Sequence, residues 1–335
     1  RLLKALFLVK YVKEFKATPR NLTVLMLDSF DADLPALRRQ IEAALDLLEQ
    51  QTYIQRNGDE YEYLTDEEKD IEQEIKNTEV DSDAVAEELG KLVFDTVLKD
   101  RKIRYENGQD YPFARRLDER LLGRDYELGI HVISPFHEHA GNETLLRAQA
   151  LGRDDLLVIL PPNDRLVRDL LMVKRTDKYV RQNSSVVQQE SVKRILNDKA
   201  FSNQERLRRL ATLVEDLLKE AKLVVNGQDV EAGSSDARTR IALGFHQLLT
   251  RAYPNLRMLR GVAYTTGDIA VCLQASAGFL GDDAATFGEA EQEMLAFVQG
   301  NQRIGLRTSM QSVVNTFERK PYGWYLAAIQ CTAAK

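Results

Sequence analysis

Cysteine and long apolar runs are scarce in this sequence of 335 residues. Its two cysteines, Cys272 and Cys331, are too few for a disulfide framework or for a zinc site of four thiolates. The longest apolar runs, 5–9 and 156–160, are far shorter than the roughly 20 residues that a membrane-spanning helix needs. Because no signal peptide is recognisable either, we expect a soluble, cytoplasmic protein without a membrane partner.

An excess of positive charge is also missing. The formal net charge is -6, from 46 Lys and Arg against 52 Asp and Glu. This balance excludes a nucleic-acid binder that is cationic as a whole, although it does not exclude a local basic patch. The composition, 44% hydrophobic and 29% charged, is that of a globular protein, and the length predicts about two or three domains.

The signatures of common active sites are absent too. The sequence contains no phosphate-binding Gly-x-x-x-x-Gly-Lys-Ser/Thr loop, no Gly-x-Ser-x-Gly turn and no His-Glu-x-x-His. Its nearest approach to a phosphate loop, Gly90-Lys91, lacks both the upstream glycine and the hydroxyl residue. We therefore predict that this chain is not an enzyme and binds no cofactor of its own.

One cluster could ligate a metal ion. It consists of His137-Glu138-His139 with Glu143, and two imidazoles and a carboxylate suit zinc. A His-x-His pair in a loop is common by chance, so we favour a polar loop and predict no metal site. A metal-dependent enzyme around His137 and His139 remains a third hypothesis. Neither His131 nor His246 has a candidate partner nearby in the sequence.

Three helices are predicted at the start of the chain. The first covers residues 2–15, and Thr18-Pro19 opens the second with an N-cap followed by proline. Asp33 and Pro35 open the third. Apolar residues are predicted to face inward at Leu22, Leu25 and Met26 of the second helix and at Leu37, Ile41, Ala44, Leu45 and Leu48 of the third.

A hairpin is predicted to follow, because Asn57-Gly58 lies between two strand-like runs. A two-residue turn there would pair Arg56 with Asp59 and Ile54 with Tyr61. The order helix, helix, helix, hairpin is that of a winged helix, whose third helix would enter a major groove. Thr65 to Glu68 then forms a capping box that opens a fourth helix.

The N-terminal segment offers three candidate contacts for DNA or a partner protein. Arg38 and Arg39 lie on the third helix, and Arg56 lies at the tip of the predicted wing. Residues 1–80 are nevertheless acidic, above all between residues 59 and 79, which argues against strong autonomous DNA binding. We therefore favour a winged helix used for packing or partner contact. Asp59, as the expected cross-strand partner, explains Arg56 more simply than DNA does.

The remainder of the chain mixes strands with helices. Strands are expected at 102–105, 111–117, 125–134, 156–160 and 222–231, with the fourth central and the third solvated on one face. Helices are expected at 83–99, 165–180 and 190–196, and a capping box at Ser202 opens another to residue 221. The predicted class is mixed α and β (α+β). Its domains are a winged helix (1–79), an α/β domain (80–231), a helical region (232–307) and the truncated start of a possible second winged helix (308–335).

A basic stretch lies in the middle of the chain. Residues 163–210 hold twice as many Lys and Arg as Asp and Glu. Lys174, Lys178 and Arg181 follow helical spacing, so one helix would align them on one face. They could contact DNA phosphates or an acidic partner, although a solvated helix face is the simpler explanation.

Several segments together resemble the P-loop protein of BREX phage-defence systems, the BrxC or PglY family. They are Tyr53–Gly58, Tyr63–Glu72, Ile75–Glu79, Arg147–Gln149, Leu156–Pro162 and Lys178–Asn183. The resemblance implies a large AAA+-like ATPase that works with a DNA methyltransferase and other BREX proteins to block phage replication. Its ATP and magnesium would bind in an N-terminal region that this sequence lacks, so no catalytic residue carries over.

The resemblance and the missing ATP site together indicate a function. We expect this chain to be a piece of a longer protein, namely the region after the nucleotide-binding core of a BREX ATPase. Its expected role is non-catalytic assembly, either as a homo-oligomer or with other BREX components. The alternative is a DNA-binding regulator that uses helix 34–50 and the wing.

Overall fold

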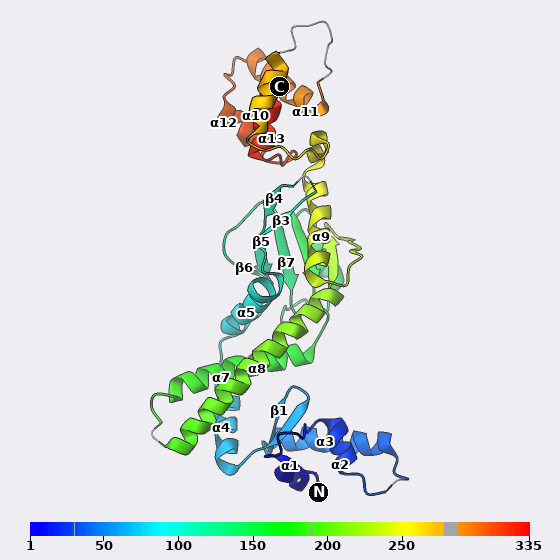
Figure 1. Cartoon of the computed structure of the whole chain (residues 1–335), viewed down its shortest axis with the longest axis vertical. Coiled ribbons are helices and arrows are strands. Elements are labelled where there is room, and N and C mark those ends of the chain that lie inside the picture. The colour runs from blue at the N-terminus through cyan, green and yellow to red at the C-terminus, as the bar shows by residue number, and fades with distance from the viewer. Residues whose placement is uncertain (30, 107, 188, 278–286) are drawn as a thin grey trace. The chain divides into compact units, whose positions relative to one another are not determined.

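The structure, a computed structural model, describes all residues of the chain except 30, 107, 188 and 278–286 (Figure 1). The chain forms two compact units, each made from two separate stretches of sequence. Unit 1 contains residues 1–97 and 163–216, and unit 2 contains residues 98–162 and 217–335. The units therefore alternate along the sequence and do not coincide with the four consecutive segments expected.

Unit 1 is mainly helical and contains one antiparallel hairpin. Its last helix and its π-helix both continue past the unit boundary. Its elements are α1 (Leu2–Val9), α2 (Pro19–Leu25), α3 (Leu34–Gln50), β1 (Ile54–Asn57), β2 (Glu60–Tyr63), α4 (Asp66–Asn77), α5 (Ser82–Gly90), the π-helix η1 (Lys91–Leu98), α7 (Asp164–Asn183) and α8 (Glu190–Glu220).

The first three helices and the hairpin occur in the predicted order. Thr18 and Asp33 cap α2 and α3 as expected, since their side chains accept hydrogen bonds from the backbone amides of Asn21 and Ala36. The inward residues Leu22, Ile41 and Leu45 lie in the core of this segment, packed with Leu2, Leu6 and Ile54. Two details were wrong: α1 ends at Val9, and Leu25 is 47% exposed. The winged-helix identity of this segment stays a prediction.

The register of the hairpin differs from the expected one. Arg56 lies opposite Tyr61, and Ile54 lies opposite Tyr63. The two turn residues are therefore Gly58 and Asp59, with Gly58 at a φ of +68°. Ile54 and Tyr61 are both buried in the N-terminal core. A turn at Asn57-Gly58 would have paired them with each other, whereas the observed register does not. The predicted pairing of Arg56 with Asp59 is wrong.

The long helix α8 is also different from the prediction. The capping box at Thr65 does open α4, but the similar pattern at Ser202 lies inside α8 and starts no helix. Instead, the next residue, Asn203, donates from Nδ2 to the carbonyl oxygen of Val173 in α7 at 3.0 Å. Helix α8 is thus continuous from Glu190 to Glu220.

Unit 2 combines a six-stranded sheet, a two-stranded ribbon and the C-terminal helices. Its elements are β3 (Lys102–Arg104), β4 (Asp110–Pro112), β5 (Ala114–Leu117), β6 (Arg120–Leu121), β7 (Gly129–Ile133), α6 (Glu143–Gln149), β8 (Asp155–Ile159), β9 (Lys222–Val225), β10 (Gln228–Asp229), α9 (Ala237–Ala252), the 3-10 helix η2 (Pro254–Leu259), α10 (Asp268–Ala277), α11 (Glu289–Arg303), α12 (Met310–Phe317) and α13 (Leu326–Ala334).

The sheet has the strand order β10-β9-β8-β7-β5-β6. Strands β5, β7 and β8 run parallel, and the outer pairs are antiparallel. The prediction that residues 156–160 form a central strand is confirmed, because β8 lies between β7 and β9. The prediction of a solvated face on β7 is wrong, since all five of its residues are buried.

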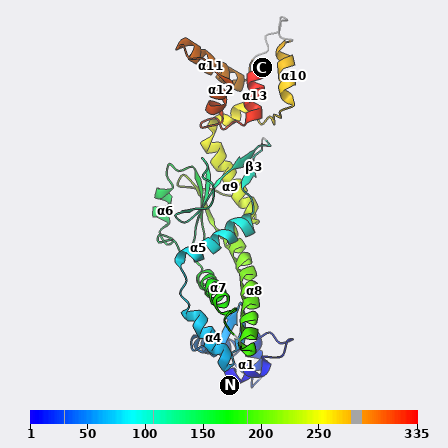
Figure 2. The same ribbon diagram turned by 90° about the vertical axis from the view of Figure 1, so that its left-hand side faces the viewer.

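Helices cover both faces of this sheet, which explains why β7 is buried throughout. Figure 2 shows α6 and α9 on opposite sides of it. Leu146 of α6 packs in one cluster with Ile133 and Val224. On the other face, a Cβ added to Gly244 of α9 would lie 3.0 Å from Leu156, so α9 approaches the sheet closely.

The C-terminal helices pack around aromatic side chains. Trp324 is fully buried and stacks on Phe317 of α12, with the ring centroids 4.8 Å apart. Its indole Nε1 donates to the carbonyl oxygen of Asn255 in η2 at 3.1 Å. Helix α11 begins at Glu289 after Gly288.

Candidate functional site

The three basic residues predicted on one helix all lie on α7, and each has a partner within unit 1. Lys174 Nζ lies 3.1 Å from Glu88 Oε2, and Lys178 Nζ donates to the carbonyl oxygen of Glu79 at 2.7 Å. Arg181 forms an ion pair with Asp177, one turn earlier on α7. Lys174 and Lys178 are therefore engaged by segments outside α7, whereas Arg181 pairs within α7 and is 73% exposed.

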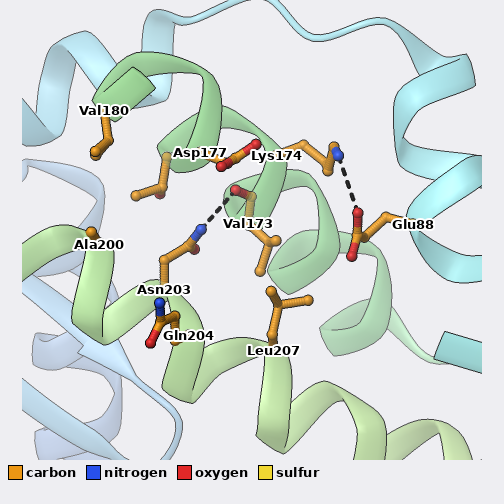
Figure 3. A pocket seen from close by; sticks show the side chains of 10 residues that line it. Glu88, Val173, Lys174, Asp177, Val180, Ala200, Asn203, Gln204 and Leu207 are labelled. Atoms are coloured by element: carbon orange, nitrogen blue, oxygen red, sulfur yellow. Dashed lines mark hydrogen bonds and ion pairs between the residues drawn. The ribbon is translucent and has the colours of Figure 1, made fainter. Parts of the chain in front are cut away.

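A pocket of about 340 Å³ opens beside Lys174, between α5, α7 and α8 (Figure 3). The Lys174–Glu88 ion pair lies at one end of it, and Val180 and Ala200 lie at the other. Its other lining residues are Val173, Thr176, Asp177, Asn203, Gln204 and Leu207.

The lining of this pocket suits binding better than catalysis. The lining combines apolar side chains with the Lys174–Glu88 ion pair. Each of the two side chains in this pair is only 18% exposed. The residues described as lining it include no histidine, cysteine or serine, and its one hydroxyl residue, Thr176, is buried. A pocket of mixed polarity in which an anchoring side chain loses its water is typical of a protein contact site.

The other three candidate residues lie apart from this pocket, on α3 and β1. Arg38 Nε lies 2.9 Å from Glu42 Oε1 on the surface of α3. Arg39 is exposed and, in the described part of the chain, forms no hydrogen bond or ion pair. Arg56 Nε donates to the carbonyl oxygen of Gly58 at 2.8 Å, and its guanidinium lies 5.5 Å from the centroid of the Tyr61 ring.

The tip of the hairpin contacts α7 and α8. Asp59 lies 3.5 Å from Arg165 of α7, and Asn57 accepts a hydrogen bond from Arg206 of α8 at 3.3 Å. A Cβ added to Gly58 would lie 3.1 Å from Nε of Arg209. The tip of the hairpin therefore contacts α7 and α8 within unit 1, while the side chain of Asp59 is 72% exposed.

A buried ion pair holds α4 and the hairpin to α8. Lys199 pairs with Glu72, and both side chains are less than a tenth exposed. Lys199 Nζ also donates to Oε1 of Gln55 in β1. Removing one member of such a pair leaves a buried charge without a counter-ion, so this contact fixes how the segments pack.

Polar residues within an apolar stripe mark the buried contacts of α8 in the sequence. Lys199 and Asn203 continue the apolar stripe of Leu196, Leu210 and Val214 at helical spacing. Polar residues within such a stripe are expected to be buried and hydrogen-bonded. Glu79 and Glu88, by contrast, carried no local signal, because their partners on α7 are far away in the sequence.

The histidine cluster does not assemble a metal site. His137 Nε2 lies 3.2 Å from Glu119 Oε1, and His139 Nε2 lies 3.0 Å from Glu138 Oε1. Glu143 pairs instead with Arg147 and Lys222. The described residues contain no group of three or more His, Cys, Asp or Glu that could hold a metal ion.

The two histidines for which no partner was expected each have one. His131 Nε2 lies 2.5 Å from the carbonyl oxygen of Asp118, and His246 Nε2 lies 2.8 Å from that of Arg104. Both partners are backbone atoms brought close by the fold, which local sequence does not reveal.

No phosphate loop forms at Gly90-Lys91. Gly90 ends α5, and the backbone amide of Lys91 bonds to the carbonyl oxygens of Glu87 and Glu88 within the helix. These residues therefore do not fit an ATP phosphate, which needs free amides. Among the described residues, no helix is long and apolar enough to cross a membrane.

Two models of known protein domains match the chain. Residues 78–248, more than half of the chain, match the BREX ATP-binding protein BrxC 4th domain with six-stranded beta sheet. Residues 270–335 match the BREX ATP-binding protein BrxC winged helix-turn-helix domain. The first match contains the whole six-stranded sheet, and the second begins within the segment expected to be a helical region. No solved structure matches this chain.

Proposed function

Because this chain belongs to the BrxC family of BREX ATP-binding proteins, we propose that it is a non-catalytic assembly region of such a protein. In this proposal it binds a second copy of itself or other BREX proteins, among them the DNA methyltransferase. It acts in the cytoplasm, and ATP and magnesium bind to an N-terminal region of the longer protein.

The observation that carries this proposal is the set of contacts that the hairpin tip makes within unit 1. Asn57, Gly58 and Asp59 each contact α7 or α8, whereas a wing that reads nucleic acid needs its tip free for that contact. This arrangement supports a hairpin that organises unit 1.

The charges of the candidate residues support the same conclusion. Neutralising phosphates requires cations that are available, whereas Lys174 is paired with Glu88 and Lys178 donates to the Glu79 carbonyl oxygen within unit 1. A protein surface is therefore a better partner than DNA for this part of α7.

The pocket between α5, α7 and α8 is the proposed contact site. Its polar groups at Lys174 and Glu88 and its apolar lining at Val173, Val180 and Leu207 suit an inserted side chain of a partner. Gln204 is exposed at this pocket, so it can be changed without opening the core.

The test is a binding experiment on the purified chain. Light scattering gives its mass, and co-purification with each BREX protein identifies partners. We expect Gln204→Trp, which fills the pocket, to weaken self-association or the partner complex at least tenfold. Lys174→Glu, which repels Glu88, is expected to act in the same direction.

Arg238→Glu is the matched control. Arg238 is a half-exposed basic residue that pairs with Asp100 in unit 2, so its reversal should leave binding unchanged. Circular dichroism and thermal unfolding show whether each variant is folded. A monomer that binds no BREX protein, or folded pocket variants that bind as well as the original chain, would overturn the proposal.

A second candidate function is DNA binding. It is favoured by the match to a winged helix-turn-helix domain and by Arg39, which is exposed. The two candidates differ in their dependence on salt and on the charge of α3.

A further inference from the structure

The only two cysteines of the sequence lie together in the C-terminal part of unit 2. Cys272 belongs to α10 and Cys331 to α13, and these helices pack against each other. The Cys272 thiol is a close neighbour of the Cys331 thiol and helps to raise its pKa. Both are free and buried, with Cys272 7% exposed and Cys331 not exposed.

The surroundings of the pair are those of a dithiol within a helical core. Cys331 Sγ lies 3.7 Å from the carbonyl oxygen of Thr265, just before α10. Neighbouring thiols on two helices that pack against each other are the arrangement from which a disulfide can close after side-chain rotation. The fold has brought together two residues that the sequence placed almost sixty positions apart.

We propose that Cys272 and Cys331 form an oxidation site at which a peroxide converts the two thiols into a disulfide that joins α10 to α13. Cys272, the slightly exposed thiol, reacts first. Its sulfur attacks one peroxide oxygen, so an S–O bond forms, the O–O bond breaks and water leaves.

The second step closes the bridge. The sulfur of Cys331 attacks the sulfur of Cys272, so the S–S bond forms and the S–O bond breaks with loss of a second water. Two electrons pass from the two sulfurs to the peroxide, and the two thiol protons end in the two water molecules.

The reaction is expected to be slow at neutral pH. Burial and the neighbouring Cys272 thiol raise the pKa of Cys331 to about 11. Because the thiolate is the reactive form, its population and the rate of closure rise about tenfold per pH unit well below that pKa. The site thus responds to sustained oxidation and ignores brief exposure.

The disulfide would close a covalent loop that contains α11 and α12. Cross-links of this kind stabilise mainly by restricting the unfolded chain. The oxidised form of the winged helix-turn-helix segment is therefore more resistant to unfolding than the reduced form.

The test uses the whole 335-residue chain, fully reduced and then treated with hydrogen peroxide. We expect a mass lower by two hydrogen atoms and a peptide map that links Cys272 to Cys331. The thermal midpoint should rise after oxidation and return with a reductant.

Two single variants separate the steps. Cys331→Ser should accumulate a sulfenic acid at Cys272 that dimedone traps, and Cys272→Ser should give far less adduct at Cys331. If a serine variant fails to fold, the mass and the peptide map of the original chain still decide. The proposal would be overturned if peroxide produced no disulfide within the chain and gave instead sulfinic or sulfonic acids, or a disulfide between two chains.

Discussion

At the scale of single residues, burial of His131 ties the stability of unit 2 to pH. His131 lies on the central strand β7, only 6% exposed. Burial, together with the charge of Arg153, lowers the pKa of its imidazole below the usual 6.5. The Asp118 carbonyl and the charges of Asp155 and Glu119 act in the opposite direction, but burial has the larger effect. The folded chain therefore takes up this proton at a lower pH than the unfolded chain.

The pH dependence has a definite sign. Between the folded pKa and about 6.5, the unfolded chain binds more protons, so the free energy of unfolding falls as pH falls. We predict that His131→Gln, whose amide can also donate to Asp118, reduces this fall by up to about 1.4 kcal/mol per pH unit. Urea unfolding of both chains from pH 7.5 to pH 5.5 measures it, and equal slopes would contradict the role of His131.

His131 also shows why an alternating sequence pattern led to a wrong prediction of solvent exposure. The alternation of apolar and polar residues around His131 predicted a strand with one solvated face. His131 is instead buried because its ring reaches a backbone carbonyl, which satisfies one polar nitrogen inside the protein. A polar residue type therefore indicates exposure only when the fold offers it no partner.

At the scale of elements, the same sequence pattern produced two outcomes. The capping box at Thr65 forms with both of its hydrogen bonds, and it was predicted correctly. At Ser202 the pattern fails because Lys199 and Asn203, on either side of it, are held by partners in α4, β1 and α7. Tertiary contacts keep α8 continuous, and no local rule contains them.

The hairpin shows the same limit. An Asn-Gly pair was read as the two turn residues, whereas the turn is Gly58-Asp59 and Asn57 ends β1. Either register places a glycine in the turn. The two registers differ by two residues and bury the same face of each strand. The contacts of the tip with α7 and α8 are the feature that favours the observed one.

We predict that Gly58→Ala destabilises the chain by about 1–2 kcal/mol. Gly58 has a φ of +68°, which alanine adopts with strain, and the added Cβ would press on Arg209. Gly141→Ala is the control, because Gly141 has open space around it and no left-handed φ. Denaturant unfolding measures both, and equal effects of the two substitutions would contradict a tightly packed hairpin tip.

At the scale of the whole molecule, the net charge of -6 opposes DNA binding. We predict no measurable binding to duplex DNA at about 150 mM salt, because too few cations are available to release counter-ions. Fluorescence anisotropy across a salt series measures it. Salt-sensitive binding in the micromolar range or tighter, weakened by Arg38→Glu or Arg39→Glu, would instead favour the DNA-binding alternative.

The family of the chain was predictable from its sequence, and the domain matches confirm it. The mixture of helices and strands and the central place of residues 156–160 were predictable too, because each depends on local periodicity. The candidate pocket was only half predictable: Lys174 was identified, whereas Glu88 and Asn203 were not. The pocket depends on three helices that come from separate stretches of the chain.

The two-part sequence of unit 1 has a consequence for synthesis on the ribosome. Residues 1–97 leave the ribosome long before residues 163–216, which complete their unit. Until Lys199 emerges, the carboxylate of Glu72 lacks its buried counter-ion, and the hairpin tip lacks Arg165 and Arg206. The N-terminal stretch of unit 1 must therefore wait, incompletely packed, while all the parallel strands of the other unit are being made.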